Sequence, residues 1–197
     1  MSGTMLGLKL ATDPRWVNIV EKNISEILTD HAYCEQKAAS NAISIAVKFP
    51  EYSDLVTAMI ELAQEELEHF DMVHKKILGR NLTLGRERKD PYVNDLLKFV
   101  DKGGIRTKAL VDRLLFAAMV EARSCERFRL LSLEINDPDL REFYHELMIS
   151  EANHYTMFLR FARKYGKEHN VEERWNEFLE YEEKIIGNYG KAETMHG

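Results

Sequence analysis

Four long stretches of the chain place apolar residues three or four positions apart, which is the spacing along one face of an amphipathic helix. Each of these faces also carries a glutamate where core packing favours leucine, namely Glu35, Glu66, Glu121 and Glu151 in chain order. The stretches cover residues 24–46, 55–77, 110–131 and 140–165. Each is longer than a typical helix of a globular protein, so the sequence predicts the helices of a bundle.

The joins between the stretches predict how these helices connect. "KFPEYSD" follows the first stretch and "NDPD" follows the third, and joins this short predict antiparallel hairpins. The middle join, residues 78–107, is long enough to cross a bundle and contains a short helical patch near residues 92–100. A further helix is expected from about residue 172 to residue 186.

Two capping signals mark the starts of long helices. Asp137 and Pro138 have the residue types of an N-cap and a first helical position. Ser53 or Asp54 is expected to cap the second long helix, because both side chains accept hydrogen bonds from backbone N–H groups.

These elements predict an all-α fold: a four-helix bundle with a long crossover between the second and third long helices and an additional C-terminal helix. A chain of 197 residues can bury most of its apolar surface in one core, so we expect a single domain over residues 1–197. The final residues, from about 187 to 197, have the composition of a loose tail.

The glutamates follow a pattern that occurs twice. Glu66 lies 31 residues after Glu35, Glu151 lies 30 residues after Glu121, and each second glutamate begins a Glu-x-x-His motif. Residues i and i+3 of a helix share a face and lie about 4.5 Å apart along the axis. The motifs therefore predict that His69 joins Glu66, and that His154 joins Glu151, inside the bundle.

Four carboxylates and two imidazoles in an apolar core require positive charge, because a buried carboxylate otherwise takes up a proton. The apolar faces carry no matching set of lysines or arginines. Two divalent cations balance four carboxylates, and ligand sets of this type hold di-iron or di-manganese centres in helical bundles. The predicted ligands are Glu35, Glu66, His69, Glu121, Glu151 and His154.

Neighbouring residues offer alternatives to these ligands. Glu65 also shares a helix face with His69, but the second copy of the motif has Ser150 at the matching position, which favours Glu66. Glu126 follows Glu121 by five residues, roughly 140° around the helix, so we expect it to point elsewhere.

Three further side chains lie near the predicted ligands in sequence. His31 is one turn before Glu35 and is either a partner of that carboxylate or a core histidine with satisfied hydrogen bonds. Cys125 is one turn after Glu121, where a small buried residue is the favoured interpretation. Tyr144 lies about two turns from Glu151, too far for a radical site beside the metals.

Composition excludes several classes of protein. Two cysteines without a C-x-x-C motif exclude a disulfide scaffold and a cysteine-rich metal site, and they suit a reducing compartment. The sequence contains neither the apolar run of a signal peptide nor a stretch long enough for a membrane span. We therefore expect a cytoplasmic protein without a membrane partner.

Several longer motifs resemble one known family. The stretches are "TDPRWV" (12–17), "DHAYCEQKAAS" (30–40), "EELEHF" (65–70), "EARSCERF" (121–128) and "SEANHY" (150–155). The glutamate and Glu-x-x-His pattern alone is typical of the whole ferritin-like superfamily. The second and fourth stretches are more specific, and with them the chain resembles the MiaE family of tRNA hydroxylases, over most of its length.

The resemblance implies a non-haem di-iron monooxygenase that acts on tRNA. Its substrate group would be the isopentenyl side chain of 2-methylthio-N6-isopentenyladenosine next to the anticodon, with O₂ and two electrons as co-reactants. The six predicted ligands would hold two iron ions, Fe²⁺ or Fe³⁺, bridged by an oxo or hydroxo group. No flavin, haem or four-cysteine motif is visible, so a separate reductase or ferredoxin would have to supply the electrons.

Charge alone does not predict an RNA partner. The formal net charge is −6, whereas RNA-binding proteins usually present a basic surface. Two basic clusters are nevertheless candidates for RNA contact, although cations near the C-terminus of a helix also stabilise the helix itself. They are Arg80, Arg86, Arg88 and Lys89 in the crossover, and Arg160, Arg163, Lys164 and Lys167 at the end of the fourth long helix.

Three other functions compete with tRNA hydroxylation. A ferroxidase or iron-storage protein requires a self-assembling cage, whereas this chain has an additional helix and a long charged crossover. A rubrerythrin-like peroxidase usually carries a four-cysteine iron site, which this sequence lacks. A purely structural bundle conflicts with six metal-binding side chains on its inner faces.

Overall fold

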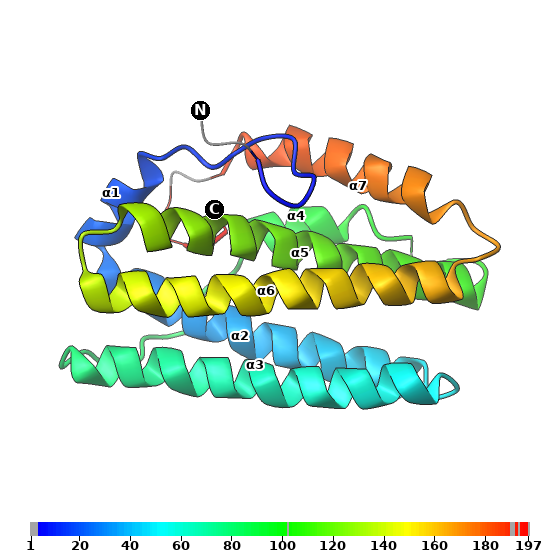
Figure 1. Ribbon diagram of the computed structural model, residues 1–197, viewed down its shortest axis with the longest axis horizontal. Coiled ribbons are helices and arrows are strands. Elements are labelled where there is room, and N and C mark those ends of the chain that lie inside the picture. Colours follow the sequence, from blue (N-terminus) through cyan, green and yellow to red (C-terminus); the bar gives the residue numbers. More distant parts are fainter. Residues whose placement is uncertain (1–3, 102, 190–191, 193, 197) are drawn as a thin grey trace. The chain divides into compact units, whose positions relative to one another are not determined.

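Seven helices make up the regular structure of the computed structural model, which describes residues 4–101, 103–189, 192 and 194–196 (Figure 1). No strand occurs among these residues. The helices are α1 (Trp16–Lys22), α2 (Ile24–Lys48), α3 (Ser53–Gly79), α4 (Pro91–Leu97), α5 (Arg106–Glu134), α6 (Pro138–Tyr165) and α7 (Val171–Ile186). Within the described part of the chain, no helix combines the length and the apolar character that crossing a membrane requires.

The chain divides into two compact units. The α2–α3 unit comprises residues 22–89 and 193–195, and the α5–α6 unit comprises residues 1–21, 90–192 and 196–197. Each is built around a long antiparallel helical hairpin, as the short joins predict. The prediction of a single domain over the whole chain stays a prediction.

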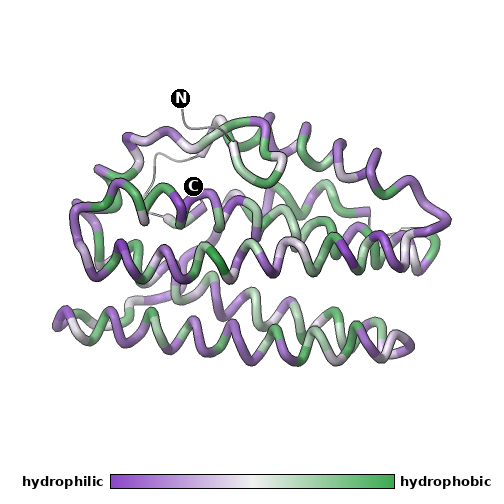
Figure 2. The backbone as a smooth tube through the Cα atoms, viewed as in Figure 1, coloured by the Kyte–Doolittle hydropathy of each residue, from purple (hydrophilic) through white to green (hydrophobic). Residues whose placement is uncertain are grey.

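In the α2–α3 unit, the two helices pack along their apolar faces. Hydrophobic and hydrophilic residues alternate along both helices with helical periodicity (Figure 2). Alanines on the buried face of α2 allow a close approach to the larger side chains of α3, among which Leu55 and Met59 are fully buried. The buried stripe predicted from the sequence is therefore confirmed along α3, and on α2 it is confirmed at Leu28, His31, Glu35 and Ala42.

The first part of the crossover is hydrogen-bonded to α2. The N–H group of Gly85 donates to Oγ1 of Thr29 at 3.2 Å, and the hydroxyl of Tyr33 donates to the carbonyl of Gly85 at 3.0 Å. A Cβ atom on Gly85 would lie 3.1 Å from Cγ2 of Thr29, so glycine permits this close contact. The Nζ atom of Lys37 donates to the carbonyl of Arg88 at 3.2 Å. These contacts fix the course of residues 85–88 along α2.

In the α5–α6 unit, α4 and α7 pack against α5, and α6 forms the second arm of the hairpin (Figure 1). Asp137 caps α6 as predicted, because its side chain accepts hydrogen bonds from the N–H groups of Asp139 and Leu140. Gly166 ends α6 where a Cβ atom would lie 2.8 Å from Cγ2 of Val111 on α5. Glycine therefore allows the end of α6 to lie directly against α5.

A buried ionic network joins α5 to α7 and α4. Arg123 is fully buried, and its guanidinium lies 2.7 Å from Oε1 of Glu182 on α7. The hydroxyl of Tyr92 on α4 donates to the same oxygen at 3.3 Å. Burial alone would lower the pKa of Arg123, but the charge of Glu182 raises it above its usual value. The ion pair thus holds α7 against α5, whose residues 121–128 are all buried.

The same network holds the N-terminal segment. Glu126 accepts hydrogen bonds from the N–H group of Thr12 at 3.0 Å, from the Thr12 hydroxyl at 2.5 Å and from Arg123 at 3.1 Å. The guanidinium of Arg127 stacks over the ring of Trp16, 4.5 Å from its centroid. Two of the family-like motifs, "TDPRWV" and "EARSCERF", therefore contact each other through structural interactions.

Two expectations from the sequence are wrong in detail. The N-cap of α3 is Tyr52, without a hydrogen bond from its side chain, and Ser53 is already the first helical residue. The end of the chain is also less loose than predicted, because Thr194, Met195 and His196 are buried. Residues 190, 191, 193 and 197 of the predicted tail lie outside the described residues.

We expect Glu182→Ala to lower the free energy of unfolding by about 3 kcal/mol, because it leaves the buried guanidinium of Arg123 without its main counter-charge. The matched control is Glu183→Ala, which removes a neighbouring exposed carboxylate and should cost less than about 0.5 kcal/mol. Urea denaturation of both variants measures the difference. Equal stability of the two variants would contradict the structural role of the ion pair.

Candidate metal centre

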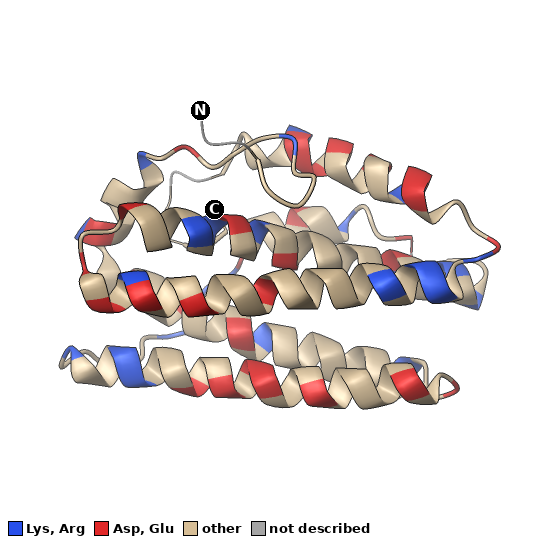
Figure 3. Ribbon diagram, viewed as in Figure 1, with Lys and Arg blue, Asp and Glu red and all other residues tan. Residues whose placement is uncertain are grey.

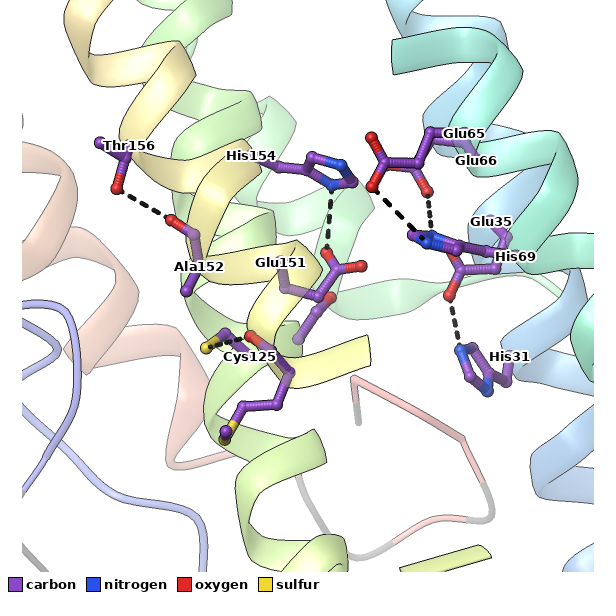
Figure 4. A network of polar contacts seen from close by, with 12 residues as sticks. His31, Glu35, Glu65, Glu66, His69, Cys125, Glu151, Ala152, His154 and Thr156 are labelled. Carbon is purple, nitrogen blue, oxygen red and sulfur yellow. Dashed lines mark hydrogen bonds and ion pairs between the residues drawn. The ribbon is translucent and has the colours of Figure 1, made fainter. Parts of the chain in front are cut away.

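The α2–α3 unit holds three of the predicted ligands in one buried cluster. Glu35 lies on α2, and Glu66 and His69 lie one turn apart on α3 (Figure 4). Each offers a ligand atom within 4.8 Å of those of the other two. The Nδ1 atom of His69 is 3.3 Å from Oε2 of Glu66 and 3.8 Å from Oε2 of Glu35. All three residues are at most 6% exposed.

Electrostatics show that this cluster attracts positive charge. Burial alone would lower the pKa of His69, but hydrogen bonds to the carboxylates of Glu35 and Glu66 raise it to about 10. Burial alone would likewise raise the pKa of Glu35, yet the hydrogen bond from His31 holds it well below its usual value. Both shifts favour ionised carboxylates beside a cation.

The α5–α6 unit holds the other three predicted ligands. Glu121 lies on α5, and Glu151 and His154 lie one turn apart on α6. Their ligand atoms are also within 4.8 Å of one another, and Nδ1 of His154 is 3.9 Å from Oε2 of Glu151 (Figure 4). Their exposed fractions are 5%, 2% and 4%. Each unit therefore has one buried cluster of two carboxylates and one imidazole.

The structure separates the competing carboxylates from these clusters. The side chain of Glu65 is 47% exposed and lies 3.9 Å from Nε2 of His69, whereas Glu66 is buried and lies 3.3 Å from Nδ1. Glu126 faces Thr12 and Arg123, in agreement with its angular separation from Glu121 on the helix. Neither side chain belongs to a cluster of three ligand atoms among the described residues.

His31 contacts one of the predicted ligands directly. Its Nε2 atom lies 2.5 Å from Oε1 of Glu35, and the imidazole N–H donates because an ionised carboxylate can only accept (Figure 4). The side chain is fully buried. Of the two interpretations left open by the sequence, the structure therefore supports a partner that orients Glu35.

Cys125 and Tyr144 have structural contacts. The thiol of Cys125 donates to the carbonyl of Met148 at 3.3 Å, and burial raises the pKa of this thiol to about 11. Tyr144 is buried, and its ring packs 5.3 Å from those of Phe128 and Phe143. Both residues therefore belong to the core, which for Cys125 is the interpretation favoured from the sequence.

Three buried polar groups in the α5–α6 unit form a chain that was not predicted from the sequence. The hydroxyl of Ser124 lies 2.9 Å from Nε2 of His196, and Nδ1 of His196 lies 2.9 Å from Oδ2 of Asp90. Asp90 also caps α4 by accepting from the N–H group of Val93. The dipeptide Asp90-Pro91 resembles the cap at Asp137, so the cap could have been found. Nothing in the sequence near His196 indicates that it is buried.

The chemistry of both clusters fits divalent transition metals. Each cluster combines oxygen donors with one imidazole nitrogen, without a thiolate, and this combination suits iron or manganese better than a thiolate-seeking metal. Two ionised carboxylates per cluster balance one divalent cation. The residues present therefore fit one metal ion for each cluster.

Comparison with known proteins points to one family. A family model described as "tRNA-(MS[2]IO[6]A)-hydroxylase (MiaE)" matches residues 4–197. A relative from Pseudomonas putida, named tRNA 2-(methylsulfanyl)-N(6)-isopentenyladenosine(37) hydroxylase, is 37% identical over 160 residues, which are 81% of this chain and 77% of the relative. A Salmonella typhimurium protein of the same name is 29% identical over 212 residues, and the match covers 84% of this chain and 77% of the relative.

One solved structure matches almost the entire chain. It is described as "Protein 43 with aldehyde deformylating oxygenase activity from Synechococcus" and has a TM-score of 0.90 and 32% sequence identity. The match covers 98% of this chain and 96% of the solved chain. The likeness confirms the predicted fold class, an all-α ferritin-like bundle with a long crossover and an additional C-terminal helix, α7.

We expect Glu121→Ala to reduce the metal-to-protein ratio by at least half, because it removes a carboxylate from the cluster on α5 and α6. The matched control is Glu126→Ala, which removes a carboxylate of the same helix. It should retain its metal but lower the melting temperature, because Thr12 and Arg123 lose their acceptor. Metal analysis and thermal denaturation distinguish the two variants. Loss of metal from Glu126→Ala alone would show that Glu126, rather than Glu121, is the residue of α5 that binds the metal.

We expect His31→Ala to weaken metal binding roughly 10- to 100-fold, because Glu35 loses the donor that orients it. His145→Ala, which removes an exposed imidazole from α6, is the control and should leave the affinity unchanged. Competition with a chelator measures both affinities. An unchanged affinity in His31→Ala would restrict His31 to a packing role.

Proposed function

Because the chain belongs to the MiaE family of tRNA hydroxylases, we propose that it hydroxylates the isopentenyl side chain of 2-methylthio-N6-isopentenyladenosine next to the anticodon of tRNA. The observation that carries the proposal is the family match over residues 4–197, together with relatives whose names specify this nucleoside. Both buried clusters fit such an activity, because hydroxylation of an unactivated carbon requires a redox-active cofactor.

We further propose that the two clusters supply the ligands of a di-iron centre. Glu35, Glu66 and His69 would hold one iron ion, and Glu121, Glu151 and His154 would hold the other. With iron bound, the centre supplies the oxidising power that inserts one atom of O₂ into a C–H bond. For each turnover the balance is one C–H group, O₂, two electrons and two protons giving one C–OH group and one water.

The residues of the chain have three tasks in this reaction. The carboxylates neutralise the cations, and the hydrogen bond from His31 keeps Glu35 ionised and fixed in orientation. Burial of all six ligands to 6% exposure or less keeps bulk water from the reacting centre. Contacts with tRNA outside the centre would hold the modified base in position, since the base has to leave its stack to react.

The electrons would come from a separate protein. The chain has only two cysteines, Cys34 and Cys125, too few for a four-cysteine iron site of its own. The thiol of Cys125 is buried and engaged by the carbonyl of Met148, as a core residue would be. A reductase or ferredoxin is therefore the partner that the proposed reaction requires.

A second candidate activity is favoured by the solved structure, whose description names an aldehyde deformylating oxygenase activity. Its identity to this chain is 32%, against 37% for the tRNA hydroxylase from Pseudomonas putida. The family model and both named relatives agree on tRNA, so the aldehyde activity ranks second. Iron storage ranks lower, and a single small oligomer rather than a cage in a size measurement would exclude it.

We expect the iron-loaded enzyme, given a reductant and ¹⁸O₂, to place one ¹⁸O atom on the isopentenyl group of tRNA that carries the modification. Digestion of the tRNA and mass spectrometry of its nucleosides measure the incorporation. His154→Ala is the matched negative control, because it removes one proposed ligand and should abolish the product.

The same assay separates the competing functions. If the isopentenyl group of the modified tRNA gains no ¹⁸O although the enzyme steadily consumes O₂, the result would falsify the tRNA proposal and leave the di-iron proposal intact. Conversion of an aldehyde in a parallel reaction would then favour the second candidate. A zinc-only protein that never takes up iron would contradict the di-iron proposal itself.

A further inference from the structure

Seven cations gather at one end of the α5–α6 unit, where blue concentrates near the end of α6 that leads to α7 (Figure 3). We call this group the basic end. Its members are Arg106, Lys108 and Arg113 of α5, and Arg160, Arg163, Lys164 and Lys167 in and just after α6. Residues 106–113 contain one carboxylate, Asp112, and residues 160–167 contain none. Asp112 is fully buried and bound by Arg174, so it neutralises little of this charge.

The two halves of the basic end belong to one surface. The hydroxyl of Thr107, in the first turn of α5, lies 2.9 Å from Nε2 of His169, which follows α6. Gly166 packs so tightly against Val111 of α5 that a Cβ atom would come within 2.8 Å of it. The start of α5 and the end of α6 are therefore adjacent, and their cations add up rather than act separately.

Helix stability explains only part of this charge. Arg163 and Lys164 lie in the last turn of α6, where cations favour the negative end of the helix dipole. Arg106 and Lys108, by contrast, lie in the first turn of α5, where the dipole is positive and acidic residues are preferred. The first turn of α5 has no acidic residue. Cations kept at this position against the dipole indicate a role outside the helix.

Two of these cations, Arg160 and Lys167, are available to an external partner. Arg163 is paired with Glu172 at 2.6 Å, and Lys108 is paired with Asp101 at 3.1 Å. In the described part of the chain, no carboxylate forms an ion pair with Arg113, Arg160 or Lys167. The last two of these are also exposed.

An aromatic ring lies among these cations. Tyr165 is partly exposed, stacks on Phe161 with centroids 6.1 Å apart, and lies 5.3 Å from Nζ of Lys164. A ring beside exposed guanidinium and ammonium groups offers stacking for a base together with contacts to phosphate. An acidic protein would require the cations but not the ring, so the surface fits RNA better.

The other basic cluster predicted from the sequence has mainly internal contacts. Arg80 donates to the carbonyl of Lys76 at the end of α3. Arg88 donates to the backbone carbonyl of Glu26 and pairs with its carboxylate, both at 3.3 Å. Glu87 lies within the same segment and pairs with Lys37 at 3.1 Å. Two of the four cations in this cluster therefore have contacts inside the α2–α3 unit, whereas Arg86 and Lys89 are exposed.

We propose that the basic end binds the phosphate backbone of the anticodon arm of tRNA. The proposal rests on the proposed function and identifies where that substrate is held. Arg160 follows His154 by six residues on α6, about 9 Å along the helix axis. Arg160 is on the exposed side of α6 and His154 on the buried side. A nucleotide whose phosphate is bound beside Arg160 would therefore have to extend its base into the core, about 9 Å along the helix, to reach the level of His154.

The test compares two matched double variants of the full-length, iron-loaded enzyme. Arg160→Gln with Lys167→Gln removes two exposed cations of the basic end, and Arg86→Gln with Lys89→Gln removes two exposed cations of the crossover. Binding of modified tRNA is measured over a range of salt concentrations. The first variant should raise the Kd about tenfold at ~0.1 M salt and reduce the slope of log K against log salt by about 1.5. The crossover variant should match the wild type in both quantities.

Four outcomes are informative, provided that circular dichroism and iron content show intact protein. Wild-type affinity and salt dependence in the first variant would overturn the proposal, as would a larger loss in the crossover variant. A loss of hydroxylation activity in the first variant that appears with a protein electron donor but disappears with excess dithionite would also overturn the proposal. The basic end would then bind an acidic redox partner. A wild-type enzyme that binds tRNA through the basic end without hydroxylating it would reject the proposed function alone.

Discussion

A carboxylate inside a helical core must have positive charge beside it, and helix α5 meets this requirement in two ways. Residues 121–128 are buried without interruption, although four of these eight residues carry charge. Glu121 belongs to a cluster suited to a divalent cation, whereas Glu126 is neutralised within the protein by Arg123. The position of α4, α7 and the N-terminal segment depends on the second solution, and the proposed chemistry depends on the first.

The sequence predicted the long helices well and indicated which side chains gather in each buried cluster, because both follow from spacing within one helix. A glutamate on an apolar face, such as Glu66, is conspicuous against its neighbours, and His69 follows at a fixed helical interval. The repetition of the motif also distinguished Glu66 from Glu65, whose side chain is half exposed in the structure whereas that of Glu66 is buried. Local periodicity was sufficient for these assignments.

Contacts between distant segments could not be predicted in this way. The partner of Arg123 on α7 is Glu182, 59 residues later, and no periodic pattern links the two positions. His196 is buried against Ser124, 72 residues earlier, in a segment whose composition indicates only a loose tail. The cap of α3 also differed from expectation, because the helix begins at Ser53 and leaves its hydroxyl outside the N-cap position. Tertiary packing, rather than local preference, decides each of these features.

The two ligand clusters are chemically unequal although one sequence pattern describes both. Glu35 accepts a hydrogen bond from His31 one turn earlier, whereas the corresponding position before Glu121 is Ala117, which has no polar group to offer. A hydrogen bond to a ligand carboxylate withdraws electron density from it and fixes its orientation. Metal ions bound at the two clusters would therefore experience different surroundings within one protein.

The network around Arg123 also constrains how this sequence can evolve. Thr12, Glu126 and Glu182 all contact one buried guanidinium, so the effect of changing any one of them depends on the identity of the others. Loss of the arginine would leave two buried carboxylates uncompensated, and an accepted change there requires simultaneous changes in segments more than a hundred residues apart. Such coupled positions should therefore vary together among related sequences. Covarying pairs that link "TDPRWV", "EARSCERF" and α7 would identify relatives independently of the predicted metal ligands.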